Sequence, residues 1–319
     1  MSVELVEVVR SGFRECVHRG SLVVLDPAGE TRMALGEVNT PIYPRSANKP
    51  LQAVALLRNG FTPADGREVA LASASHAGEP EHVAGVLAML GRNGLSEKDL
   101  RCPPDLPSDE TARARVLSTA GAGPRPVFMN CSGKHAAMLA VCAARDWPRG
   151  TYTDVMHPLQ QEILATIADL AGEDEYELGI DGCGLPIVPL SLTALARAFA
   201  ALVTAAPGSA ERTVADAIRE HPWLLSGTGQ DDVRLMSAVP GLLCKTGADG
   251  VHAGALPDGT AFAVKIDDGH ERARLPLTAA LLHRVGVEWT EELAELASAP
   301  VLGGGVRVGT VRAVPGAFG

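Results

Sequence analysis

The 319-residue sequence is poor in aromatic residues, which make up only 4% of the chain. It also lacks an apolar run of about 20 residues, the length needed to span a bilayer, and any dense block of lysine and arginine. The net charge of −10 argues against a nucleic-acid partner, and the acidic residues 1–7 are unlike a signal peptide. These absences predict a soluble, cytoplasmic, globular protein with no membrane partner and a core of small aliphatic side chains.

The cysteines are few and scattered, at positions Cys16, Cys102, Cys131, Cys142, Cys183 and Cys244. A disulfide framework is not expected in a chain of this length in a reducing compartment. Cys142 lies in an apolar helical pattern and is expected to be a buried small hydrophobe. Cys131, Cys183 and Cys244 instead occur in glycine-containing turn stretches, so they are candidates for a site.

Strand patterns occur at both ends of the chain and helical patterns occur between them. Residues 21–35 and 251–266 each predict a β-hairpin, the second around Pro257-Asp258-Gly259. Apolar periodicity predicts helices over residues 82–90, 134–144, 158–170, 192–202, 212–220 and 275–284. The pattern predicts one α/β (α+β) domain, residues 1–319. Its sheet comes from residues 1–45 and 240–319, with a helical region over 46–239 inserted between them.

Ser46 and Lys49 precede the apolar run 51–57 and are three residues apart. If the run is helical, the hydroxyl and the amine share one face near the helix N-terminus, where free N–H groups favour negative charge. A hydroxyl beside an amine that can accept its proton is a candidate nucleophile. The alternative is that Ser46 only caps the helix.

Ser75 and His76 follow the apolar residues 69–71, which we expect to form a strand. Ser75 is either a second hydroxyl in a site or the cap of a helix that includes His82.

The stretch from Asn130 to His135 contains Cys131 and Lys134, again three residues apart and at the start of an apolar run. A thiol at a helix N-terminus near a lysine should have a lowered pKa, which suits nucleophilic or metal chemistry. The alternative is a capped helix with a buried cysteine.

Two further stretches carry reactive side chains. The glycines around Asp181 and Cys183 predict a tight turn that presents both side chains. Lys245-Thr246-Gly247, on an expected strand, combines with Ser46-x-x-Lys49 in the manner of penicillin-recognising enzymes.

Together these motifs resemble the L-asparaginase II family, the Rhizobium-type or class 3 asparaginases, from about residue 9 to beyond residue 269. The resemblance implies a fold similar to the serine β-lactamases and β-lactamase-like glutaminases, a homodimer, and L-asparagine as substrate. It implies two catalytic Ser–Lys tandems, Ser46 with Lys49 and Ser75 with Lys245. It implies one zinc ion near the active site, bound by Cys131, Lys134 and Cys183. It also implies a substrate pocket lined by Arg45, Asn130, His135 and Asp181.

The sequence departs from the family pattern at Thr246, where the Rhizobium enzyme carries an apolar residue, and it is shorter in loops after Cys183. We expect Ser46 to attack the amide and release ammonia and aspartate, with Asp181 pairing with the substrate α-ammonium group. The alternatives are a cytoplasmic β-lactam-recognising serine hydrolase and a non-catalytic protein that binds an amino acid or zinc. For the cysteines, the alternative is a reduced thiol pair or a reversible Cys131–Cys183 disulfide.

Overall fold

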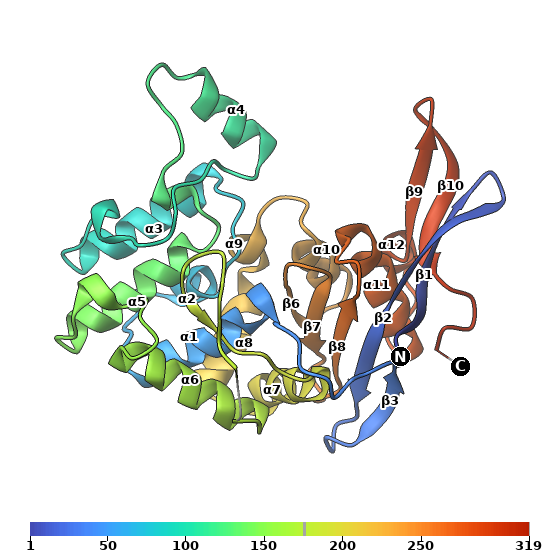
Figure 1. The fold of residues 1–319 in the computed structure, drawn as a ribbon, viewed down its shortest axis with the longest axis horizontal. Coiled ribbons are helices and arrows are strands. Elements are labelled where there is room, and N and C mark those ends of the chain that lie inside the picture. The colour runs from blue at the N-terminus through green and yellow to red at the C-terminus, as the bar shows by residue number, and fades with distance from the viewer. Residues whose placement is uncertain (175–176, 319) are drawn as a thin grey trace. The chain divides into compact units, whose positions relative to one another are not determined.

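The computed structural model describes residues 1–174 and 177–318 and divides them into two compact units. The sheet unit consists of Met1–Ala47, Leu190–Ala200 and Arg234–Gly319. The helical unit consists of Asn48–Pro189 and Ala201–Val233. Figure 1 shows the elements of both units.

The sheet unit is built on one eight-stranded sheet with the order β6-β7-β8-β2-β1-β10-β9, and β3 pairs with β2. All pairs in this sheet are antiparallel. The long strand β2 links the N-terminal and C-terminal segments, because it pairs with β1 along its first half and with β8 and β3 along its second half. The strands are β1 (Val3–Arg10), β2 (Phe13–Leu25), β3 (Thr31–Leu35), β6 (Leu243–Thr246), β7 (Val251–Ala255), β8 (Ala261–Ile266), β9 (Ser298–Gly303) and β10 (Val306–Ala313).

Both predicted hairpins are confirmed, as β2–β3 and as β7–β8. The prediction missed β1, β9 and β10. Register shifts interrupt the β1–β2 and β9–β10 ladders. Such bulges break the strict alternation on which strand prediction depends.

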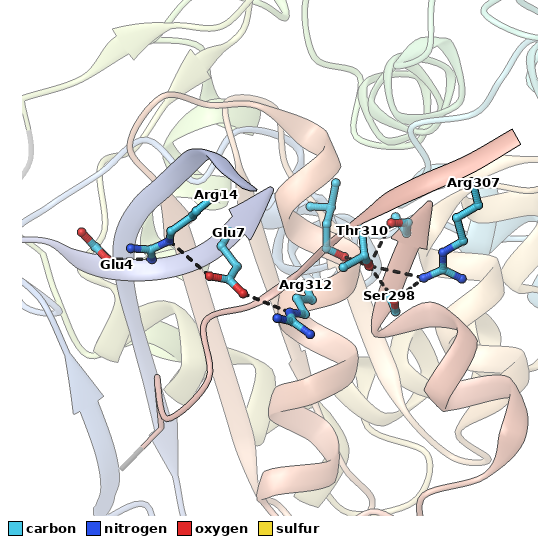
Figure 2. A network of polar contacts seen from close by, with 9 residues as sticks. Glu4, Glu7, Arg14, Ser298, Arg307, Thr310 and Arg312 are labelled. Atoms are coloured by element: carbon cyan, nitrogen blue, oxygen red, sulfur yellow. Dashed lines mark hydrogen bonds and ion pairs between the residues drawn. The ribbon is translucent and has the colours of Figure 1, made fainter. Parts of the chain in front are cut away.

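A network of ion pairs lies on the sheet unit, where β1, β2 and β10 are adjacent (Figure 2). Glu7 lies between two arginines, 3.1 Å from Arg14 Nε and 3.0 Å from Arg312 Nε. Arg14 also pairs with Glu4 at 2.8 Å. We call Glu4, Glu7, Arg14 and Arg312 the sheet network.

Two helices of the sheet unit lie between β8 and β9 in the sequence. They are α11 (Arg274–Arg284) and α12 (Glu291–Leu296), preceded by the 3₁₀ helix η5 (Glu271–Ala273). The helices α7 (Leu192–Thr204) and α10 (Asp231–Ala238) contribute residues to both units.

The helical unit contains most of the helices and a two-stranded ladder of β4 (Gly179–Ile180) and β5 (Pro186–Ile187). Its α-helices are α1 (Lys49–Arg58), α2 (Gly66–Ala72), α3 (Pro80–Arg92), α4 (Glu110–Ser118), α5 (Ser132–Ala144), α6 (Pro158–Ala171), α8 (Ala210–Glu220) and α9 (Pro222–Ser226). Short 3₁₀ helices occur at η2 (Glu97–Asp99), η3 (Pro126–Phe128) and η4 (Arg149–Thr151), and η1 (Arg45–Asn48) leads into α1.

All six predicted helices are present, and the α/β (α+β) prediction of a sheet from both chain ends with helices inserted between them is confirmed. One prediction is wrong: residues 69–71 lie in helix α2 rather than in a strand. Asp65 caps this helix by accepting a hydrogen bond from Glu68 N at 3.3 Å, a signal outside the short apolar run that we interpreted.

Both capping alternatives for the candidate serines are also wrong. Helix α3 begins at Pro80 with Glu79 as its N-cap, so Ser75 does not cap it. Asn48 is the N-cap of α1, and Ser46 lies in η1 before it. Within residues 1–174 and 177–318, no helix combines the length and the apolar character needed to cross a membrane.

Candidate active site

Lys49 is the centre of a polar cluster in the helical unit. Its side chain is fully buried at the start of α1. Its ammonium group donates to Ala74 O at 2.7 Å, to Ser75 Oγ at 2.8 Å and to Asn130 Oδ1 at 3.2 Å. A buried charge of this kind is costly unless several acceptors surround it. The arrangement therefore joins three segments of the sequence around one amine.

The backbone fixes the loop that carries Ser75 on both sides. Ser75 N donates to Leu225 O at 2.8 Å, and His76 N donates to Asn130 O at 3.1 Å. These bonds tie the segment after α2 to α9 and to the start of α5. Ser75 as a whole is half-buried, and its hydroxyl accepts the hydrogen bond from the buried Lys49 ammonium.

Hydrogen bonds of His76 and Ser132 also hold the loop that carries Ser75. His76 Nδ1 accepts a hydrogen bond from Gly78 N at 3.1 Å, so its Nε2–H donates to Ser132 Oγ, 2.8 Å away. Ser132 in turn donates to Val127 O at 2.9 Å. The pKa of His76 lies well below 6.5 because of burial and the charges of His82 and Lys49. His76 is therefore neutral, and it links the loop that carries Ser75 to the segment around the start of α5.

Gly133 explains how α5 reaches this position. A Cβ atom at Gly133 would lie 2.4 Å from Leu71 O, closer than real contacts allow. Only glycine lets the first turn of α5 pack directly against the backbone of α2. Cys131 and Lys134, on either side of it, are thereby held next to the Ser75 loop.

Cys131, Lys134 and Cys183 form a second buried cluster, with exposed fractions of 1–2%. Lys134 Nζ lies 3.6 Å from Cys183 Sγ, and Cys183 Sγ lies 3.7 Å from Asp181 Oδ2. Cys131 Sγ contacts Asn130 Oδ1 at 2.9 Å, the same oxygen that accepts from Lys49. Asn130 therefore connects the two clusters.

The pKa values of the two thiols are shifted in opposite directions. A hydrogen bond from Cys183 lowers the pKa of Cys131 well below 9.0, helped by the charges of Lys49 and Lys134, although burial opposes the shift. The same hydrogen bond, together with burial, raises the pKa of Cys183. Burial lowers the pKa of Lys134, but the charges of Cys183, Cys131 and Asp181 outweigh it and the net shift is upward. The two lysines and the second thiol therefore favour loss of the Cys131 proton, while the cluster favours the charged form of Lys134.

The predicted turn around Asp181 is present between β4 and β5, with Asp181 N donating to Leu185 O at 2.9 Å and Gly184 in a left-handed conformation. Asp181 is half-buried, as a presented side chain should be. Cys183 differs from the expectation, because it is only 1% exposed. The turn directs the thiol inward, toward Lys134.

His135 follows Lys134 on α5 and is fully buried. Its Nδ1 lies 2.6 Å from Tyr152 Oη. Burial and the charges of Lys134 and Lys49 hold the pKa of His135 well below 6.5. The ring is therefore close to the cluster but is not solvent-exposed pocket lining in this state.

Three of the predicted residues, Arg45, Ser46 and Lys245, belong to the sheet unit. Arg45 has a left-handed backbone (φ 52°) and pairs with Asp249, which is also left-handed (φ 56°). Strained non-glycine residues cluster at functional sites. Lys245 is fully buried on β6, as predicted for a strand lysine, and its Nζ donates to Thr246 O at 3.0 Å.

These motifs are the ones that carried the predicted resemblance, and comparison of the whole chain decides it. Residues 6–313 match the L-asparaginase II family. The chain belongs to this family. As a member it is an amidohydrolase, an enzyme that hydrolyses carbon–nitrogen amide bonds. No curated protein matches the chain by sequence.

Solved structures show more distant similarity. A β-lactamase from Mycobacterium bovis is 15% identical with a TM-score of 0.47, over 83% of this chain and 94% of that one. Mglu in its native form is 17% identical with a TM-score of 0.35, over 79% of this chain and 60% of that one. EstCE1, a hydrolase with promiscuous acyltransferase activity, is 13% identical with a TM-score of 0.36, over 84% of this chain and 89% of that one. The family assignment rests on the family match alone.

The cluster of Cys131, Lys134 and Cys183 fits a zinc ion in its chemistry. Two sulfur ligands and one nitrogen ligand converge in a buried place, and both cysteines are free. Three protein ligands leave a fourth position for water or substrate, as in catalytic zinc sites. Lys134 would first have to lose the proton that its surroundings favour.

The sequence analysis missed the roles of Ser132 and Tyr152. Ser132 lies inside the Cys131–Lys134 motif, and its hydroxyl is hydrogen-bonded to His76. Tyr152 is one of only three tyrosines in a chain poor in aromatics, and it is fully buried. A buried phenol needs a polar partner, but its sequence position gave no indication that the partner is His135.

Proposed function

We propose that the chain is an L-asparaginase, which hydrolyses the side-chain amide of L-asparagine to L-aspartate and ammonia through an acyl-enzyme on a serine. The observation that carries the proposal is the hydrogen bond from the buried Lys49 ammonium to Ser75 Oγ at 2.8 Å. Buried lysines in hydrogen-bond reach of a hydroxyl are the arrangement that activates a serine. Family membership supplies the amide as the bond to be cleaved.

In the proposed reaction, Ser46 is the nucleophile, and a lysine of the network that has first lost its own proton to solvent accepts the serine proton. Lys49 would serve Ser46, which precedes it by three residues along the chain, while Ser75 and Lys245 form the second tandem. Attack on the amide carbon gives a tetrahedral intermediate, whose collapse breaks the C–N bond. The leaving amine takes a proton from the network and departs as ammonia. Water then hydrolyses the ester, giving aspartate and regenerating the serine.

We propose that Asp181 pairs with the substrate α-ammonium group and that Arg45, Asn130 and His135 bind its other polar groups. Asp181 is half-buried on the β4–β5 turn, and its carboxylate lies 3.7 Å from Cys183 Sγ, next to the buried cluster. We also propose that Cys131, Lys134 and Cys183 hold one zinc ion, which when bound would supply positive charge next to the site. We expect the protein to be a homodimer, which light scattering would test.

The contact between Lys49 and Ser75 raises the question of which serine, Ser46 or Ser75, is the nucleophile. Ser75 Oγ accepts a hydrogen bond from the Lys49 ammonium, so Ser75 is the rival nucleophile. Rapid quenching during asparagine turnover, followed by peptide mass spectrometry, identifies the acylated serine. We expect the acyl group on Ser46, and an ester on Ser75 would exchange the two roles.

The function is tested by measuring ammonia release from L-asparagine and L-glutamine with the wild type, Ser46→Ala, Ser75→Ala and the exposed control Ser118→Ala. We expect the wild type to hydrolyse asparagine. Ser46→Ala and Ser75→Ala should lose turnover, and Ser118→Ala should keep the activity of the wild type. Because Lys245 and Thr246 lie on strand β6 and Gly247 follows it directly, the same set is assayed with a chromogenic cephalosporin. Cephalosporin hydrolysis without ammonia release would indicate a β-lactam-recognising enzyme. Asparagine binding without any turnover would indicate a binding protein.

A further inference from the structure

Tyr152 and His135 form a buried pair that the proposed reaction does not yet explain. Tyr152 follows η4 and is fully buried, and its Oη lies 2.6 Å from His135 Nδ1. The same oxygen accepts a hydrogen bond from Arg101 N at 3.0 Å. A backbone N–H can only donate. The peptide of Arg101 therefore fixes one lone pair of the phenol.

This bond decides the direction of the next one. If Tyr152 donates its hydroxyl proton to His135 Nδ1, every polar group of the phenol is satisfied. If His135 donated instead, the phenol proton would have no acceptor among the residues that the structure describes, and the buried Nε2 would also lack a donor. Each unsatisfied buried polar group destabilises the folded protein. The first arrangement leaves one such group rather than two, so His135 carries its proton on Nε2.

The Nε2–H group of His135 is then a donor that the protein itself does not use. It is fully buried and has no hydrogen-bond partner among residues 1–174 and 177–318. Two other buried histidines have the same tautomer but are satisfied. His76 donates from Nε2 to Ser132 Oγ, and His157 donates from Nε2 to Pro148 O at 3.0 Å. His82 Nδ1 is also buried without a partner among the described residues, but it is an acceptor, because Nε2 of that ring faces Trp223 O. The unused nitrogen of His135 is a donor, so it is a position that a bound acceptor can fill.

The position of the ring on α5 directs it toward the site. His135 lies four residues after Cys131, and the backbone N–H of His135 donates to the backbone oxygen of Cys131 at 3.1 Å. Residues four apart share one helix face, and helical side chains lean toward the N-terminus. The imidazole therefore lies over the end of α5 that carries Cys131 and Asn130. The charges of both Lys49 and Lys134 act on it, which agrees with this placement.

We propose that Tyr152, held by the Arg101 peptide, is a positioning residue that keeps His135 in its Nε2–H tautomer so that this donor binds an acceptor oxygen of the substrate. The ligand is an amino acid with a carboxylate or amide oxygen. The inference rests on the proposed function for the identity of that ligand. Tyr152 itself contacts no substrate and acts only through His135.

The first test reads the tautomer directly in the wild-type protein. Long-range ¹H–¹⁵N spectra of ¹⁵N-histidine-labelled protein distinguish a protonated Nε2 from a protonated Nδ1. We expect His135 to be protonated at Nε2, and its Nε2 resonance to shift when L-aspartate is added. His157 should show the same tautomer and no shift, as the internal reference. A protonated Nδ1 in wild-type His135, or a Nε2 resonance that does not respond to aspartate, would overturn the proposal.

The second test uses Tyr152→Phe, which removes the hydroxyl and keeps the ring. The Nδ1–H tautomer should appear in the spectrum, and the KM for asparagine should rise about tenfold, as expected for one lost hydrogen bond. The kcat should change little, because this contact is present in both ground and transition states. In a His135→Gln background the same substitution should cause no further rise in KM. A full additional rise there would show that Tyr152 acts independently of His135.

These readouts separate the two proposals. If asparagine is not hydrolysed but the tautomer is as expected and Tyr152→Phe changes it, the proposed function fails and the positioning role stands. If asparagine is hydrolysed and Tyr152→Phe leaves the tautomer unchanged, the positioning role fails alone. Should Tyr152→Phe not fold, the spectrum of the wild type still decides the tautomer and the response to aspartate.

Discussion

The polar cluster of the helical unit and the sheet network use the same kinds of charged groups in opposite surroundings. Lys49 and Lys134 are at most 2% exposed. In the sheet network Glu7 is also buried, at 7%, but the Arg14 and Arg312 side chains that pair with it are 40% and 48% exposed. Charges in water interact weakly, and exposed ion pairs contribute little to stability. Buried charges are costly, and they persist where a protein needs them. The buried lysines therefore belong to the proposed chemistry, whereas we expect the sheet network to contribute only to stability.

The first prediction concerns a change in the buried polar cluster. Replacing Lys49 with methionine removes the amine but keeps the length of the side chain, so Ser75 loses its partner. We expect kcat for asparagine to fall by about 10²–10⁴-fold, the usual contribution of general acid–base catalysis. Steady-state ammonia release measures the effect, and Lys98→Met, at an exposed lysine on η2, is the control. Equal activity of the two variants would remove Lys49 from the mechanism.

The second prediction concerns the zinc cluster. Lys134→Met and Cys131→Ser each remove one proposed ligand, and we expect the dissociation constant for zinc to rise about 100-fold or more. Equilibrium dialysis with elemental analysis measures it. Zinc affinity should also fall as the pH falls, because Lys134 can ligate only after losing the proton that Cys183, Cys131 and Asp181 stabilise.

Cys142→Ser is the matched control for this experiment. Cys142 is also a buried cysteine on α5, but burial raises its pKa to about 11 and it lies outside the cluster. Its substitution should leave zinc binding unchanged. Zinc content that stayed constant through acid pH and in Lys134→Met would contradict the ligand assignment. It would leave the alternative of a reduced thiol pair or a reversible disulfide.

The third prediction uses buried histidine rather than lysine. The pKa of His76 is well below 6.5 in the folded protein because of burial and nearby positive charge. Its contribution to stability is therefore present above pH 6.5. Below that value the unfolded state binds a proton that the folded state does not, and stability is lost by about 1.4 kcal/mol per pH unit until the folded pKa is reached.

Urea unfolding of the metal-free protein between pH 7 and pH 5.5 measures this slope. His82 has a lowered pKa for the same main reason, burial, and adds to the slope in the same direction. His76→Gln should flatten the curve compared with the wild type. An identical slope in the two proteins would show that His76 does not titrate with unfolding.

The comparison also explains what the sequence could and could not predict. Local signals predicted the hairpins and the longer helices, because turn residues and apolar periodicity lie within a few positions of one another. The spacing of Ser46 with Lys49, and of Cys131 with Lys134, marked candidate residues for the same reason. The contact of Lys49 with Ser75 spans 26 positions, and that of His135 with Tyr152 spans 17 positions. Such contacts depend on how helices pack, which periodicity does not specify.

The inward direction of Cys183 is a further case of this kind. Glycines predicted the turn correctly, but a turn can present its side chains to water or to the protein. The Cys183 thiol points toward the protein, where it contacts Lys134 on α5, 49 positions away in the sequence. The bulged strands β1, β9 and β10 were missed for the opposite reason, since their local pattern is itself irregular.

The last prediction tests the exposed side and has the smallest expected effect. Arg312→Ala removes one of the two arginines that flank Glu7 (Figure 2), and Arg14 remains 3.1 Å from the carboxylate. The loss should be about 0.2–1 kcal/mol of unfolding free energy, smaller at high salt, because the guanidinium is half exposed. The kcat for asparagine should be unchanged. Arg307→Ala, whose side chain bonds Ser298 Oγ at 2.8 Å on the same unit, is the matched control. A loss of activity in Arg312→Ala at unchanged stability would assign the sheet network a part in the chemistry and end the contrast between the two units.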